Sequence, residues 1–139
     1  MAVQVEQIGP TTGKGTVRTH SVTIDRPVEK GGTDRGPLGG ELLLLSLGGC
    51  FLSNLLAAIG ARSADVSGIR ITVTGAIGGV PERFEGIEMR VTAKYDDTDL
   101  MQKLVAIAER GCIVTNTLNT ATPITIVLER EDRHEGNST

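Results

Sequence analysis

The sequence predicts an α+β fold in which antiparallel strands pack against helices. Two segments, 69–77 and 87–95, alternate between apolar and polar residues, as strands with one buried and one solvated face do. A third segment, 42–61, carries no charged residue and is long enough for a helix, and a fourth, 97–111, repeats apolar residues at helical spacing. Because each alternating segment has one core face and a short connection joins the two, we expect an antiparallel sheet.

The composition limits both the size and the function of the chain. Its 139 residues suit a single domain over 1–139, with a polar, flexible tail at 131–139. Hydrophobic residues make up 39% and aromatic residues only 2%, so the core must be aliphatic, and aromatic platforms for single-stranded nucleic acid are missing. With a net charge of −3, no basic surface for nucleic acid or an anionic membrane is expected.

Two strands and a long loop are predicted before the first helix. The strands cover 2–9 and 15–25, and a turn at 9–13 joins them. Residues 26–40 contain several glycines and prolines, which break regular structure, and we expect a functional loop there. By the period-two rule, one face of the second strand would carry Arg18, His20, Val22 and Ile24.

The first helix is predicted from about Gly40 to Arg62. Because it is apolar all round it must be buried on nearly all sides, and a chain of this length cannot surround it, so we expect a homodimer. We reject a membrane span because Gly48, Gly49 and Asn54 interrupt the segment and no aromatic or Lys/Arg cluster flanks it. A stripe of small side chains is either a close-packing face or the floor of a pocket; it consists of Ser46, Cys50, Ser53 and Ala57.

The second half of the chain predicts a hairpin, two helices and a strand. Residues 78–86 connect the two alternating segments. A helix is predicted from the region of Asp97 to Gly111, and a short one begins at Cys112. A last strand is predicted over 124–128. The core face of the hairpin consists of Ile69, Ile71, Val73, Ile87, Met89 and Val91.

The two cysteines are the residues best suited to chemistry. A cysteine is nucleophilic only as the thiolate, which a helix start or a nearby cation favours and apolar burial opposes. Cys112 follows Gly111 at a predicted helix start, so the residues alone favour Cys112 as the more acidic thiol. Cys50 lies in the middle of an apolar helix and needs a cation or a hydrogen-bond donor beside it.

Candidate cations for Cys50 come from the segments before the first helix. Arg18 is the first candidate, followed by His20 and Arg35. Glu41 is a candidate to orient such an arginine through a bidentate pair, and its alternative role is to complement the dipole at the helix start.

No metal or cofactor site is predicted. The cysteines and the two histidines show no ligand spacing, and no Walker, GxGxxG or GxSxG motif is present. Residues 1–8 alternate like a strand and lack the basic and long apolar parts of a secretory signal, so we expect a cytoplasmic location. In that compartment two cysteines are more often catalytic or redox-sensing than a structural disulfide.

Two longer motifs surround the cysteines. The first is GGTDRGP from Gly31, followed by GELLLLSLGGC ending at Cys50, and the second is CIVTNTL at 112–118. Together, and in the order of elements over 14–130, they resemble the OsmC/Ohr family, the osmotically induced and organic hydroperoxide resistance proteins. The resemblance implies an OsmC-like intertwined homodimer in which antiparallel sheets enclose two central helices.

The resemblance also implies a thiol-dependent peroxidase without a cofactor, acting in oxidative stress defence. Cys50 would attack an organic hydroperoxide or hydrogen peroxide and become a sulfenic acid, and Cys112 would condense with it to a disulfide. A dithiol or lipoyl-type reductant would reset the enzyme. Arg18 is the nearest match to the arginine that supports the thiolate in this family, and Glu41 to the glutamate that holds that arginine.

Departures from the family pattern keep other hypotheses open. The family's glutamate stands at the position of Gly40, one residue before Glu41, and Ile113 replaces the usual proline. The second hypothesis is a non-enzymatic redox-sensing or small apolar-ligand-binding dimer whose pocket is floored by the small-residue stripe. A third makes both cysteines inert core residues.

Overall fold

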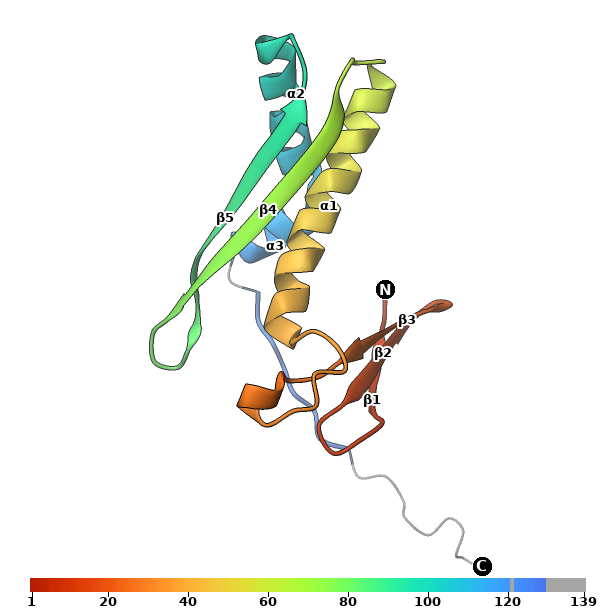
Figure 1. Ribbon diagram of the computed structural model, residues 1–139, viewed down its shortest axis with the longest axis vertical. Coiled ribbons are helices and arrows are strands. Elements are labelled where there is room, and N and C mark those ends of the chain that lie inside the picture. The colour runs from red at the N-terminus through yellow and green to blue at the C-terminus, as the bar shows by residue number, and fades with distance from the viewer. Residues whose placement is uncertain (121, 130–139) are drawn as a thin grey trace, which may run out of the picture.

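Two antiparallel sheets and three α-helices form the computed structural model, which describes residues 1–120 and 122–129 (Figure 1). This arrangement confirms the predicted α+β class. In chain order the elements are β1 (Gln4–Gln7), β2 (Gly13–Val17), β3 (His20–Ile24), the 3-10 helix η1 (Val28–Lys30), α1 (Gly39–Ala61), β4 (Ser67–Gly78), β5 (Arg83–Lys94), α2 (Thr98–Gly111) and α3 (Ile113–Leu118).

The strand predicted over 15–25 is wrong: the chain forms two strands there. β2 pairs with β3 in antiparallel register, and the pairing of Val17 with His20 leaves Arg18 and Thr19 as a two-residue turn. Arg18 has a φ of 54°, the positive value that two-residue hairpin turns require. Turns of this kind usually contain glycine or asparagine, and Arg18-Thr19 contains neither, so the alternating pattern predicted one continuous strand across the turn. Because Arg18 lies in the turn, it does not share a strand face with Val22 and Ile24.

A buried carboxylate, Asp25, organises the loop after β3. Asp25 is 2% exposed, and its oxygens accept hydrogen bonds from the hydroxyls of Thr11 (2.9 Å), Thr12 (3.1 Å) and Thr33. Two backbone N–H groups, those of Arg26 and Arg35, donate to the same carboxylate. The Thr33 hydroxyl most of all, and then the other donors against the opposing effect of burial, hold the pKa of Asp25 well below its usual range.

The same loop lies directly on β3. A Cβ atom at Gly36 would lie 2.1 Å from the carbonyl oxygen of Thr23, so only glycine fits this approach. The backbone N–H of Asp25 donates to the carbonyl of Pro37 at 3.1 Å. The chain therefore reaches the start of α1 from a fixed position on the first sheet.

The core lies between the β4–β5 hairpin and one side of α1. The predicted core face of the hairpin is confirmed, because its six apolar residues pack against the buried cluster. α1 contributes Leu47, Phe51, Leu55 and Ala58 to this cluster, and Gly48 faces β4 so closely that a Cβ there would lie 3.0 Å from Val73 Cγ2. α1 begins and ends within one residue of its predicted bounds.

α2 and α3 close the core along α1. Asp97 caps α2 by accepting a hydrogen bond from the Leu100 N–H at 3.0 Å, and α2 buries Met101, Leu104 and Ala108. α2 ends at Gly111, and Cys112 is the N-terminal cap of α3, as predicted. The single residue between the helices places Cys112 inside the core.

The opposite side of α1 is open in the single chain. Leu43, Leu45 and Leu56 are 37%, 65% and 52% exposed. By length and composition alone α1 could cross a membrane, and 28% of its most apolar window is buried within the chain. A helix this apolar and this exposed needs a further covering surface.

The strand predicted over 124–128 is not formed. In the described part of the C-terminal region, residues 122–129, no strand is present, and Ile124, Ile126 and Leu128 are 87%, 91% and 95% exposed. An alternating segment becomes a strand only where a free sheet edge lies alongside it, and this chain pairs the segment with neither sheet. The tail predicted at 131–139 lies outside the described residues.

Asp25→Asn should make the stability of the protein less dependent on pH. The folded-state pKa of Asp25 is lower than its ordinary value of 3.8, so its stabilising contribution is present above that value and is lost as the pH falls towards the folded pKa. Asp25→Asn should therefore lower the thermal midpoint at pH 7, and the difference from wild type should shrink below about pH 4. The measurement is a series of melting curves against pH. Asp65→Asn, at an exposed carboxylate, is the control, and an equal loss at every pH would contradict the assignment.

Candidate active site

The fold brings the two cysteines together where α1 passes the junction between α2 and α3. Cys50 is half-buried on α1, and Cys112 at the junction is fully buried. Both are free, and Cys50 packs against the core cluster that contains Cys112. Cys50 is also among the groups that lower the pKa of Cys112. Two segments far apart in sequence thus form one dithiol site.

Several donors around Cys112 favour its thiolate. Burial opposes the charge, but the side chain and backbone N–H of Thr115, the Cys50 thiol and the backbone N–H of Val114 together lower the pKa of Cys112 below its ordinary value. The Thr115 N–H lies 3.5 Å from the Cys112 sulfur. The buried Thr115 hydroxyl falls short of full hydrogen-bond geometry and has no other partner among the described residues. Donors at the start of α3 thus favour the Cys112 thiolate, as expected for a cysteine at a helix start.

Asn54 is a site residue that the sequence interpretation did not single out. Its amide nitrogen lies 3.0 Å from the Cys50 carbonyl oxygen, 3.8 Å from the Cys50 sulfur and 3.3 Å from the Gly111 carbonyl oxygen. The available signal was a polar residue one helical turn after Cys50 in an otherwise apolar helix.

Glu41 lies at the start of α1 and caps that helix. Its Oε1 atom accepts a hydrogen bond from the backbone N–H of Leu38 at 2.8 Å, which satisfies one of the free donors of the first turn. The side chain is exposed. Of the two roles considered for Glu41, the single chain shows the one at the helix start.

Arg18 lies in the β2–β3 turn, away from Cys50. The side chain is exposed, and its Nη1 atom is 3.5 Å from the Nε2 atom of His20. Within residues 1–120 and 122–129, no hydrogen bond or ion pair links Arg18 to Cys50 or to Glu41. Figure 1 shows the first sheet beyond the start of α1, with the β2–β3 turn directed away from that helix. The single chain therefore brings no cation to the thiol pair from this sheet.

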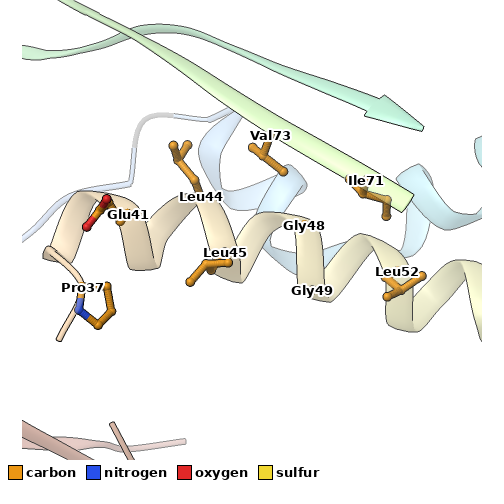
Figure 2. A pocket seen from close by; sticks show the side chains of 9 residues that line it. All are labelled: Pro37, Glu41, Leu44, Leu45, Gly48, Gly49, Leu52, Ile71 and Val73. Atoms are coloured by element: carbon orange, nitrogen blue, oxygen red, sulfur yellow. The ribbon is translucent and has the colours of Figure 1, made fainter. Parts of the chain in front are cut away.

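Two cavities border the elements that carry the thiols, and neither lining includes a cysteine. One of about 570 Å³ lies along α1 on the side of β4, and Figure 2 shows Gly48 and Gly49 without side chains between leucines of α1 and residues of β4. The other, of about 520 Å³, lies towards β5 and includes Thr115, Phe51 and Glu109 in its lining. No cluster of three or more metal-ligating side chains occurs in the described part of the chain. The first cavity is lined by Pro37, Glu41, Leu44, Leu45, Gly48, Gly49, Leu52, Ile71 and Val73.

Comparison with known proteins places this geometry in a family. The family model described as OsmC-like protein matches residues 32–127, a range that contains both cysteines. No curated protein matches the chain by sequence.

Solved structures share the fold at low sequence identity. A protein from Psychrobacter arcticus is 20% identical with a TM-score of 0.74, and the match covers 84% of this chain and 87% of that one. An OsmC-like protein from Mycoplasma pneumoniae is 17% identical, with a TM-score of 0.67 and coverage of 85% and 86%. An organic hydroperoxide resistance protein from Elizabethkingia anophelis is 18% identical, with a TM-score of 0.65 and coverage of 84% and 86%. At these identities the likeness concerns the fold.

Thr115→Val should raise the pKa of Cys112, because the substitution keeps the volume but removes the hydroxyl that favours the thiolate. The measurement is the ultraviolet absorbance of the thiolate against pH in a Cys50→Ser background. One tyrosine and no tryptophan keep the absorbance background low.

Thr117→Val is the matched control on the same helix. Its hydroxyl donates to the Ile113 carbonyl at 2.7 Å and is exposed, so the titration of Cys112 should not move. Equal titration curves for Thr115→Val and its parent would show that the hydroxyl has no influence on the thiol.

Proposed function

The chain belongs to the OsmC family, and on that premise we propose that it is a thiol-dependent peroxidase acting through Cys50 and Cys112. Its substrates are organic hydroperoxides or hydrogen peroxide, and its role is defence against oxidative stress in the cytoplasm. The observation that carries the proposal is the meeting of the two free thiols at the junction of α1, α2 and α3.

The different burial of the two thiols supports a division of roles. Cys50 is half-buried and keeps part of its surface open to a peroxide, whereas Cys112 is 0% exposed and cannot meet one. The lowered pKa of Cys112 suits a second nucleophile, because a thiolate is needed to attack a neighbouring sulfenic acid. The buried thiol with the lowered pKa is therefore assigned to the second step, and the more accessible thiol to the first.

In the proposed cycle the Cys50 thiolate attacks one peroxide oxygen. The O–O bond breaks, Cys50 becomes a sulfenic acid, and the leaving oxygen takes up a proton and departs as an alcohol or as water. The Cys112 thiolate then attacks the Cys50 sulfur, the S–O bond breaks, and hydroxide leaves with a proton as water. A dithiol or lipoyl-type reductant donates two electrons by exchange with the disulfide and restores both thiols.

We also propose a homodimer as the functional unit. Three features support it: the open side of α1, the apolar cavity along that helix, and the unpaired alternating segment 124–128. A second copy offers a surface of the same apolar character for all three. In the single chain Arg18 does not contact Cys50, so its proposed support of the thiolate requires placement by the dimer, with Glu41 as the candidate to orient it.

A second candidate function is a redox-sensing or apolar-ligand-binding dimer. An apolar cavity of about 570 Å³ along α1 favours it, as does the use of Glu41 as a helix cap. The lining of this cavity contains none of the small-residue stripe that was expected to form its floor. The two functions differ in turnover, because a sensor or ligand binder oxidises once per thiol pair and a peroxidase consumes peroxide continuously when reductant is present.

The peroxidase proposal predicts that Cys50→Ser reduces peroxide consumption to the uncatalysed background, because the attacking sulfur is gone. Wild type treated with one equivalent of cumene hydroperoxide should lose two hydrogens per chain and give a Cys50–Cys112 bridge in the peptide map. Cys112→Ser should react once and then accumulate sulfinic acid. The measurements are intact-mass analysis and peroxide consumption with a dithiol, with hydrogen peroxide tested in parallel. Rapid oxidation without continued consumption would favour the redox sensor, and full activity in Cys50→Ser would refute the assignment.

The homodimer proposal predicts that Leu45→Glu produces a monomer. Leu45 is 65% exposed on the open side of α1, where a second copy would bury it, and a carboxylate cannot enter an apolar interface without a partner. The measurement is molar mass by light scattering. Val80→Glu, at a residue 98% exposed in the β4–β5 connection, is the control and should leave the mass unchanged. A wild-type monomer at micromolar concentration would contradict the proposal.

A further inference from the structure

We propose that Asn54 is a positioning residue for the thiol pair: its side-chain amide ties the backbone next to Cys112 to the helix that carries Cys50. The inference rests on the proposed thiol cycle and deepens it. It assigns to a residue outside the cysteine motifs the task of keeping the second thiol in place during the reaction.

The contacts of Asn54 reach both sides of the site. One amide nitrogen has three acceptors within reach, which are the Cys50 carbonyl at 3.0 Å, the Gly111 carbonyl at 3.3 Å and the Cys50 sulfur at 3.8 Å. A carbonyl can only accept, so the NH₂ group of the amide must point towards these atoms. One of its two N–H groups can donate to the carbonyl and sulfur of Cys50, and the other can donate to the Gly111 carbonyl.

The bond to Gly111 acts on Cys112 through a single peptide link. Gly111 is the last residue of α2, and its carbonyl is among those that a helix end leaves without an internal partner. A Cβ at Gly111 would lie 3.5 Å from Asn54 Oδ1, which shows that the amide lies against this residue. Asn54 thus satisfies a free carbonyl and fixes the turn that presents Cys112.

The bond to the Cys50 sulfur changes in strength during the proposed cycle. A thiol sulfur is a weak acceptor, but a thiolate carries a full charge, and hydrogen bonds to charged groups are the stronger ones. The bond from the Asn54 N–H to Cys50 is therefore strongest in the step of the cycle in which Cys50 is a thiolate. Once Cys50 is a sulfenic acid, the Gly111 bond keeps Cys112 beside it, so closure of the disulfide competes well with further oxidation.

Positioning can be measured without peroxide. The equilibrium of the Cys50–Cys112 disulfide with glutathione gives the effective concentration of one thiol at the other. Asn54→Ala should lower this effective concentration by about tenfold, the factor that one hydrogen bond of ordinary net strength supports. In peroxide reactions, disulfide closure should slow by a similar factor, and a larger fraction of Cys50 should reach the sulfinic acid.

Two further variants separate positioning from general stability. Asn54→Asp keeps the shape but has no N–H to donate, so it should behave like Asn54→Ala. Ser53→Ala alters the exposed neighbouring residue on α1 and should match wild type in both assays. Melting curves of each variant show that comparisons are made between folded proteins.

The outcomes distinguish this inference from the proposed function. If the wild-type protein does not react with peroxides, the peroxidase proposal fails, but the glutathione equilibrium still tests whether Asn54 positions the two thiols. If Asn54→Asp and Asn54→Ala keep the wild-type effective concentration and the wild-type ratio of disulfide to sulfinic acid, the inference is overturned. A lower effective concentration in both, with Ser53→Ala unchanged, supports it.

Discussion

An apolar helix covered on one side only is the constraint on which the rest of this structure depends. α1 buries Leu47, Phe51, Leu55 and Ala58 against the hairpin and α2, and it leaves leucines on its other side in the open. The hairpin, α2 and α3 all pack against the side of α1 that carries these buried residues. Exposed apolar area is unfavourable, and no element within residues 1–120 and 122–129 covers the second side. The helix itself is therefore the strongest argument for the proposed second copy.

The same asymmetry gives the two thiols their different properties. Cys50 lies at the boundary between the covered and open sides of α1, whereas Cys112 is on the covered side, in the turn that ends α2. Donors in the first turn of α3 outweigh burial and lower the pKa of Cys112. The more accessible thiol is that of Cys50, and the thiol with the lowered pKa is that of Cys112. A two-step thiol cycle can use this combination.

The sequence predicted those features that depend on local patterns and missed those that depend on distant ones. α1, the β4–β5 hairpin, α2 and the short helix after Cys112 follow from periodicity and capping, so their bounds came close to those observed. The turn at Arg18 was missed because the residues there are not usual turn formers, and the strand at 124–128 was overpredicted because alternation cannot show whether a sheet edge is available. The role of Asn54 depends on its hydrogen bond to Gly111, which lies 57 positions away in the sequence. A local sequence pattern cannot predict such a contact.

The loop before α1 limits how Arg18 can reach the thiols. Asp25 holds the end of β3, the β1–β2 turn and residues 33–35 together through five hydrogen bonds, and Pro37 is bonded to the backbone of Asp25. The first sheet is therefore attached firmly at the end nearest α1, and Arg18 lies at the opposite end of the β2–β3 hairpin. Bringing Arg18 to Cys50 within one chain would mean breaking this network. In the proposed dimer the arginine can come from the second copy with the network intact. The apolar side of α1 and the separation of Arg18 from Cys50 in the single chain therefore both support that proposal.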